Sequence, residues 1–191
     1  MNNFVIYNKD NAPAGSDELL AGVNKAYGFT PNLLGTMAES PATLQGYLTL
    51  GKILETSSLS ATEQQVVLLA VSRFNECHYC LAAHTTIADM QKVSREVVDA
   101  IRNDQPIADE RLESLRRFAT LITEKRGWAS EDDVAEFYAA GFTQANVLEV
   151  ILAASLKTIS NYVNHVADTP VDGAFSKNGW TPADTAGQEV A

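Results

Sequence analysis

Two cysteines and a histidine lie close together near the middle of this chain. Cys77 and Cys80 form a C-x-x-C pair that contains both cysteines of the sequence, and His84 follows four residues later. Such a pair can alternate between a dithiol and a disulfide, and a neighbouring imidazole can accept or donate a proton near neutral pH. The spacing therefore predicts thiol redox chemistry, with a metal site as the alternative.

On a helix, which we expect over residues 76–90, these three side chains share one face. Neighbours three or four positions apart have Cβ atoms about 5–6 Å apart, so the two sulfurs can reach each other and His84 can reach Cys80. Cys77 would lie at the helix N-terminus, where free N–H groups and the helix dipole favour a thiolate. One thiolate can attack a peroxide and become a sulfenic acid, which the second thiol converts to a disulfide.

A metal site and an inert pair of core thiols are the alternatives to redox chemistry. Structural zinc sites usually have four ligands, and Cys77, Cys80 and His84 supply three. His78 points about 100° away from Cys77 on a helix and is a poor fourth ligand. Cysteine is also a good small core residue, which leaves the inert interpretation open. The preferred interpretation requires neither a metal nor an organic cofactor.

The composition is that of an ordinary soluble globular protein. Of 191 residues, 46 % are apolar and 20 % are charged, which is enough for a proper core. A net charge of −10 argues against nucleic acid or an anionic membrane as a partner. Neither a secretory signal nor an apolar run of bilayer length is apparent. We therefore expect a cytoplasmic protein, in which a lone cysteine pair is more typical of catalysis, redox sensing or metal binding than of a structural disulfide.

Helix signals follow one another along nearly the whole chain. Residues 60–63, Ser-Ala-Thr-Glu, form a capping box. The segment after it, 66–71, is apolar on almost every side, which predicts a central buried helix. A second apolar segment covers residues 147–156 and continues to residue 165. No segment shows the alternation of a β-strand, so the pattern predicts an all-α protein.

The domain organisation follows from the same pass along the chain. We predict a single all-α domain over residues 1–191. Residues 1–15 precede the first helix signal, and residues 169–191 are rich in Pro, Gly, Asp and Thr. We expect both segments to be extended arms or tails.

The stretch from the capping box to His84 resembles the carboxymuconolactone decarboxylase superfamily, and within it the alkylhydroperoxidase D-like, or peroxidase-related, branch. The resemblance is strongest over residues 40–105 and weaker over residues 31–34 and 161–165. It implies an all-α fold with the C-x-x-C at the N-terminal end of a helix. It also implies a homo-oligomer, as a trimer, dimer or hexamer, with the thiols near a subunit interface.

The resemblance further implies reduction of hydroperoxides to alcohols. Cys80 matches the peroxidatic cysteine, and Cys77 matches the resolving cysteine, which takes electrons from a dithiol donor such as a lipoyl- or thioredoxin-type protein. His84 matches the histidine beside the peroxidatic sulfur. The helix-dipole argument instead favours Cys77 as the thiol with the lower pKa. The sequence leaves the two assignments open.

One position departs from the family pattern. The proton-relay glutamate of the family lies twelve residues before the first cysteine, where this chain has Gln65. Glutamine can form hydrogen bonds but cannot accept the thiol proton. Glu63 and Glu76 are the nearest carboxylates in the sequence, and we hypothesise that Glu76 serves because it adjoins the same helix N-terminus.

The sequence therefore predicts a thiol-dependent alkyl hydroperoxide reductase of the antioxidant type. A carboxymuconolactone-decarboxylase-type lyase is one alternative, although members with that activity typically lack the C-x-x-C. A non-enzymatic helical oligomer that senses redox state or binds zinc is the other.

Overall fold

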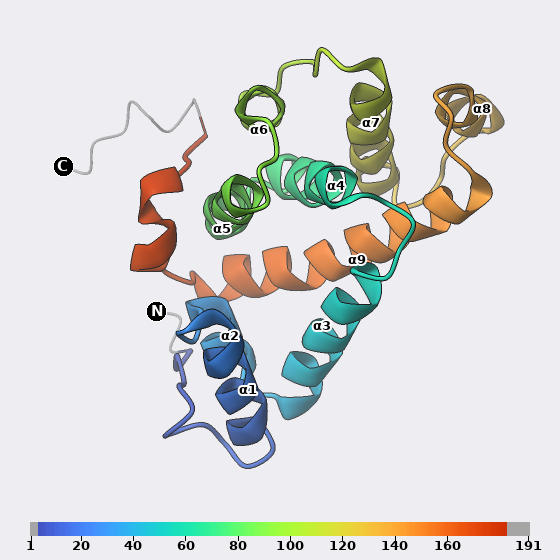
Figure 1. The fold of residues 1–191 in the computed structure, drawn as a ribbon. Helices are drawn as coiled ribbons and strands as arrows, with labels where there is room; N and C mark the ends of the chain where they lie inside the picture. Colours follow the sequence, from blue (N-terminus) through green and yellow to red (C-terminus); the bar gives the residue numbers. More distant parts are fainter. Residues whose placement is uncertain (1–3, 183–191) are drawn as a thin grey trace.

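Helices make up the secondary structure of residues 4–182, which are the residues that the computed structural model describes (Figure 1). Nine α-helices and one 3-10 helix, η1, follow one another there without a strand between them, which confirms the all-α prediction. The elements are, in chain order, α1 (Asp17–Tyr27), α2 (Asn32–Met37), α3 (Pro41–Leu54), α4 (Ala61–Phe74), α5 (His78–Met90), α6 (Arg95–Arg102), α7 (Glu110–Glu124), α8 (Glu131–Ala139), α9 (Gln144–Ala167) and η1 (Gly173–Asn178).

Two buried helices, α4 and α9, form the centre of the molecule. The predicted capping box begins α4: the Ser60 hydroxyl accepts a hydrogen bond from the Glu63 N–H at 3.2 Å, and the Glu63 carboxylate accepts one from the Ser60 N–H at 2.8 Å. Residues 65–72 of α4 are all buried. Helix α9 has 24 residues and crosses the molecule against α3, α4 and α7 (Figure 1). The two apolar segments of the sequence are thus the two central helices.

The buried apolar side chains form two clusters. The larger one joins α4 to α6, α7, α8 and α9, and includes the stacked rings of Phe118, Phe137 and Phe142, whose centroids lie 4.1 and 4.3 Å apart. The smaller one joins α1, α2 and the start of α3 to the N-terminal end of α5, and both cysteines belong to it. The thiols therefore lie where the N-terminal helices meet the main bundle.

A tight turn joins α4 to α5 and fixes the position of Cys77. Glu76 has a φ of +53°, in the left-handed region that ends α4, and the Cys77 N–H donates back to the Ser72 carbonyl at 2.9 Å. Helix α5 therefore begins at His78, two residues after the predicted start at residue 76. Cys77 is the N-cap of α5, so the C-x-x-C lies at the helix N-terminus as expected.

The N-terminal arm is attached to the fold as far as it is described. The Tyr7 N–H donates to the Gly35 carbonyl at 3.1 Å, and the Tyr7 hydroxyl donates to the Glu39 carboxylate at 2.6 Å. A Cβ on Gly35 would lie 2.5 Å from the Tyr7 carbonyl oxygen, so this contact requires glycine. Residues 1–3 of the predicted arm lie outside the described residues.

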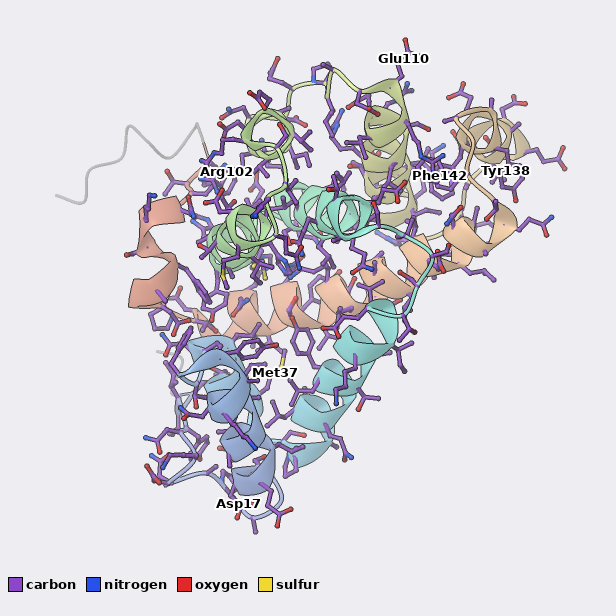
Figure 2. The ribbon with its side chains drawn as sticks, viewed as in Figure 1. Asp17, Met37, Arg102, Glu110, Tyr138 and Phe142 are labelled. Atoms are coloured by element: carbon purple, nitrogen blue, oxygen red, sulfur yellow. The ribbon has the colours of Figure 1, made fainter. Side chains whose placement is uncertain are left out.

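The predicted C-terminal tail is structured over its first half. Residues 169–182 contain η1, and the segment 170–180, here called the strap, packs against α5 and returns to the end of α6 (Figure 1). The Arg102 guanidinium, labelled in Figure 2 at the end of α6, donates to the Gly179 carbonyl at 2.8 Å, and the Trp180 indole donates to the Arg102 carbonyl at 3.1 Å. The sequence prediction of an extended tail is wrong for this segment, because side chains of α5 and α6 hold it. Residues 183–191 lie outside the described residues.

No single helix among the described residues is both long enough and apolar enough to cross a bilayer. Helices α8 and α9 are long and apolar enough only when they are taken together, and a bend of 109° separates them.

Candidate thiol site

Both cysteines are free thiols in the interior of the protein. Cys77 is 0 % exposed and Cys80 is 1 % exposed. The Cys77 sulfur caps α5 by accepting a hydrogen bond from the Cys80 N–H at 3.4 Å. This bond holds the two residues one helical turn apart with their sulfurs close enough to interact. The structure thus brings together the two thiols that the sequence paired.

A stripe of buried polar side chains on α9 faces the thiols. Lys157, Ser160, Asn161 and Asn164 are each no more than 5 % exposed, and their spacing of three, one and three residues places them on one side of the helix. We call them the α9 polar stripe. Because a buried polar group without a partner is costly, each of these side chains requires a specific neighbour.

Two members of the α9 polar stripe contact the sulfurs directly. The Asn164 amide N–H₂ lies 3.3 Å from the Cys80 sulfur and 3.7 Å from the Cys77 sulfur. The Ser160 hydroxyl lies 3.8 Å from the Cys80 sulfur and itself donates to the Lys157 carbonyl. An amide donor aimed at sulfur stabilises a thiolate more than a thiol, because the thiolate is the better acceptor.

Asn161 connects the stripe to the end of α4. Its amide oxygen accepts a hydrogen bond from the Asn75 side chain at 2.9 Å, and its N–H₂ lies 3.5 Å from the Ser72 hydroxyl. Ser72 also provides the carbonyl that holds Cys77 in the turn. Asn161 therefore fixes α9 to the turn that carries the first cysteine.

Lys157 is a fully buried lysine whose ammonium group faces the thiols. It is 1 % exposed and interacts with Cys80, with the Tyr47 hydroxyl of α3 and with Cys77. None of the ion pairs among residues 4–182 involves it. Burial lowers the pKa of Lys157, but the negative charge of the Cys80 thiolate outweighs burial and raises the pKa above its usual value. The sulfur thus takes the place of the carboxylate that a buried lysine normally needs.

The two thiols have opposite acidities. Burial raises the pKa of Cys80, but the hydrogen bond from Cys77 and the positive charge of Lys157 outweigh it and bring the pKa well below its usual range. The pKa of Cys77 is raised, first because its proton is held in the hydrogen bond to Cys80 and second by burial. Of the two sulfurs, Cys80 is therefore the one whose surroundings favour the thiolate, and Cys77 is the one whose surroundings favour the thiol. The helix-dipole argument pointed to Cys77, and the charge of Lys157 reverses it.

His84 faces Gln65 across the α4–α5 contact. The His84 Nδ1 atom lies 3.1 Å from the Gln65 Oε1 atom, and His84 is partly buried. Burial, and after it the charge of Lys157, lowers the pKa of His84 well below its usual range, so the ring is neutral at pH 7. With Nδ1–H donating to the glutamine oxygen, Nε2 keeps a free lone pair. No hydrogen bond joins His84 to either sulfur in the described part of the chain.

The two carboxylates suggested by the sequence do not reach the thiols. Glu76 has a side chain that is 60 % exposed, and its carboxylate lies 4.0 Å from Arg73. Glu63 belongs to the capping box and pairs with Arg111 at 3.0 Å. The structure does not support the hypothesis that Glu76 replaces the relay glutamate, since the positive φ of Glu76 turns its side chain outward, toward Arg73, from the turn before α5.

Tyr79, between the two cysteines, connects the start of α5 to α2 and to the strap. Its hydroxyl donates to the Asp172 carboxylate of the strap at 2.5 Å and accepts from the Leu33 N–H of α2 at 3.3 Å. Asp172 also accepts from the Asn32 N–H at 3.1 Å. Tyr79 therefore forms a buried polar contact that the sequence did not indicate.

None of the four residues of the α9 polar stripe is among the candidate residues that the sequence suggests. Lys157, Ser160, Asn161 and Asn164 follow the i, i+3, i+4, i+7 pattern inside an otherwise apolar helix, and that pattern indicates a buried polar face. The signal was therefore present in the sequence. What it could not show is which residues, distant in the chain, the stripe would meet.

A metal site does not fit the residues present. Among residues 4–182, no group of three or more His, Cys, Asp or Glu side chains could hold a metal ion. His84 is hydrogen-bonded to Gln65 rather than directed at the sulfurs, which leaves two soft ligands where structural zinc takes four.

Comparison with known families agrees with this geometry. Residues 41–121 match the model of the carboxymuconolactone decarboxylase family, and this range contains α3 to α6, most of α7 and both thiols. The match stops before α9, so it does not include the polar stripe. No curated protein sequence matches this chain.

Solved structures show the same fold over nearly the whole chain. A peroxidase-related protein from Ralstonia eutropha JMP134, described as an alkylhydroperoxidase AhpD core, is 20 % identical with a TM-score of 0.79, and the match covers 92 % of this chain and 96 % of that one. A peroxidase-related protein from Silicibacter sp. TM1040 is 19 % identical with a TM-score of 0.76, covering 91 % and 94 %. The debrominase Bmp8, solved with 2,3,4-tribromopyrrole, is 16 % identical with a TM-score of 0.76, covering 93 % and 96 %. The chain therefore has the AhpD-like fold.

Proposed function

We propose that this protein is a thiol-dependent reductase of organic hydroperoxides, with Cys80 as the peroxidatic cysteine and Cys77 as the resolving one. The observation that carries the proposal is the set of donors around Cys80: the Asn164 amide lies 3.3 Å from its sulfur, against 3.7 Å from the Cys77 sulfur, and buried Lys157 interacts with it. A thiolate is the nucleophile toward a peroxide, and Cys80 is the thiol held in that form. The resolving thiol is needed only after the first step, and Cys77 keeps its proton until then.

The reaction balances in two steps. The Cys80 thiolate attacks the terminal oxygen of the hydroperoxide, the S–O bond forms, the O–O bond breaks, and the alkoxide leaves as an alcohol after taking up one proton. Cys77 then loses its proton and attacks the Cys80 sulfur, so that a disulfide forms and the hydroxyl leaves as water. An external dithiol, of lipoyl or thioredoxin type, reduces the disulfide by thiol–disulfide exchange.

The surroundings of the thiols favour an organic hydroperoxide over hydrogen peroxide. Both cysteines belong to the smaller apolar cluster, together with side chains of α1, α2 and α3. Met37 of this cluster is labelled in Figure 2, where α2 approaches α9. An alkyl or aryl group gains free energy in such surroundings, at roughly 25 cal/mol per Å² of apolar surface buried.

We also propose that the protein acts as a homo-oligomer in the cytoplasm. The face of α9 opposite the polar stripe carries the exposed side chains of Leu148, Ile151, Tyr162 and Val166, at helical spacing. An apolar stripe along a 24-residue helix is typical of a surface that a second copy covers. Light scattering tests this proposal, and a monomer at micromolar concentration would contradict it.

Thiol titration tests the proposed reaction. One equivalent of cumene hydroperoxide should remove two free thiols per chain from the reduced protein, and a dithiol should restore them. The Cys80→Ser variant should lose none. Steady-state turnover with lipoyl- and thioredoxin-type donors then identifies the electron source. Undiminished thiols in the wild-type protein would overturn the proposal, and release of bromide from a brominated pyrrole would assign the dithiol to dehalogenation instead.

A further inference from the structure

The charge around the thiols differs from what a relay glutamate would provide. Gln65 is neutral, and Glu63 and Glu76 are directed elsewhere. The charged group that faces the sulfurs is the Lys157 ammonium. Its titratable neighbours are Cys80 and Cys77 of α5, Tyr47 of α3 and, more weakly, His84 of α5. Among the described residues, the site therefore holds a cationic proton donor and lacks the carboxylate of the family pattern.

Lys157 lies on the face of α9 that contacts both sulfurs, and it interacts with Cys80 and Cys77. Lys157 is 1 % exposed. The next turn of α9 carries Ser160, whose hydroxyl lies 3.8 Å from the Cys80 sulfur. Asn164, one turn further, contacts both sulfurs at 3.3 and 3.7 Å. The lysine side chain thus belongs to the same rigid helix face that fixes the thiols. Its ammonium has no competing carboxylate among the ion pairs of the described residues.

We propose that Lys157 is a catalytic residue that carries the protons of this reaction in place of the relay glutamate. This inference rests on the proposed peroxidase function for the identity of the substrate. The effect of Lys157 on the Cys80 thiolate is the same whichever substrate is reduced.

The lysine acts once as an acid and once as a base. In the first step its ammonium pairs with the Cys80 thiolate and gives a proton to the departing alkoxide, leaving a neutral amine beside a neutral sulfenic acid. In the second step the amine takes the proton of Cys77, whose thiolate then attacks the Cys80 sulfur and displaces hydroxide. The hydroxide takes up a proton from solvent to become water, and Lys157 is again an ammonium. Reduction of the disulfide by the external dithiol then regenerates the Cys80 thiolate and the Cys77 thiol.

Two substitutions separate the charge of Lys157 from its proton. Lys157→Met removes both, and its apolar side chain suits a buried position. Lys157→Arg keeps a positive charge but cannot give up a proton at any working pH. Lys52, an exposed lysine of α3 with no role in the site, provides the matched control Lys52→Met.

The first measurement is the pH titration of thiolate absorbance near 240 nm in a Cys77→Ser background, where Cys80 is the remaining thiol. We expect a midpoint below the ordinary thiol value of about 8.5 in the background protein and with Lys52→Met. It should stay low with Lys157→Arg and exceed about 8.5 with Lys157→Met, because only hydrogen bonds then oppose the effect of burial. An unchanged midpoint in folded Lys157→Met protein would overturn the inference. If that variant does not fold, a midpoint of 8.5 or higher in the background protein would overturn it.

The second measurement is single-turnover oxidation and disulfide formation with cumene hydroperoxide in the Cys77-containing protein. Lys157→Arg should keep a low thiolate midpoint yet form the disulfide at least about ten-fold more slowly than wild type at pH 7. A wild-type rate in that variant would overturn the proton-carrying role. If the wild-type protein shows the low midpoint but no reaction with hydroperoxide, the proposed function fails and the thiolate–lysine pair stands.

Discussion

The amide of Asn164 donates to the Cys80 sulfur at 3.3 Å, while the oxygen of the same amide is buried without a hydrogen-bond partner. A buried acceptor with no partner costs about 1–3 kcal/mol, so it is retained for a reason other than stability. Asn164 thus combines a donor beside the Cys80 sulfur with an acceptor that has no partner in the protein.

Asn164→Asp should raise the pKa of Cys80, because a carboxylate would replace the amide donor beside the thiolate. We expect the thiolate fraction at pH 7 to fall about ten-fold for each unit of increase. Asn164→Leu should have a smaller effect of the same sign. The 240 nm titration in the Cys77→Ser background measures both. A lower pKa in the Asn164→Asp protein would contradict this account of the site.

The neutral state of His84 predicts a pH dependence of stability. Burial lowers the pKa of His84 in the folded protein, so the unfolded chain binds more protons below its own pKa of about 6.5. The free energy of unfolding should therefore fall as the pH drops from about 7 toward 5, by at most about 1.4 kcal/mol per pH unit from this group. Urea unfolding of wild type and His84→Gln at both pH values measures it. The wild type should lose more stability than the variant, and equal losses would contradict the prediction.

Substitution of Gln65 should slow the reaction more than substitution of Glu76, which is the reverse of what the sequence suggested. Glu76 is exposed, so Glu76→Gln should change single-turnover oxidation by hydroperoxide by less than about two-fold, since surface pairs such as Glu76 with Arg73 contribute little. Gln65 fixes the His84 ring through a 3.1 Å contact, so Gln65→Leu should slow the reaction several-fold. A large loss in the Glu76 variant with no loss in the Gln65 variant would restore the carboxylate hypothesis.

The attachment of the strap to α5 should depend on the hydrogen bond between Tyr79 and Asp172. Tyr79→Phe removes a 2.5 Å hydrogen bond and leaves a buried carboxylate with the backbone N–H of Asn32. We expect a loss of about 1.5–3 kcal/mol in the free energy of unfolding, the range for hydrogen bonds to charged groups. Hydrogen exchange should also increase in residues 170–180. Tyr138→Phe, at an exposed position, is the control. An equal loss in the free energy of unfolding in that variant would contradict the role of the Tyr79–Asp172 hydrogen bond.

Local signals in the sequence were enough for the helices and for the dithiol. The capping box at Ser60 and Glu63 predicts the start of α4 correctly, because both partners lie within four residues. Cys77 and Cys80 are likewise joined by one helical turn, so their proximity follows from the fold class alone. The start of α5 was misplaced by two residues because the sequence did not show that Glu76 takes a left-handed conformation.

The electrostatics of the site could not be predicted in the same way. Lys157 is separated from Cys80 by 77 residues, and its charge matters only because α9 crosses behind α5. The strap shows the same limit: residues 169–182 have a loop composition, yet Arg102, Asn178 and Trp180 fix them by contacts between segments distant in the chain. Composition describes what a segment prefers alone, and tertiary contacts override it.

The assignment of Cys80 as the peroxidatic cysteine is the central claim, and trapping the first intermediate tests it most directly. Reduced Cys77→Ser and Cys80→Ser proteins would each be treated with one equivalent of cumene hydroperoxide and a sulfenic-acid trap such as dimedone, and the adduct located by mass spectrometry. We predict an adduct on Cys80 in the Cys77→Ser protein and none on Cys77 in the Cys80→Ser protein. An adduct on Cys77 with none on Cys80 would contradict the account.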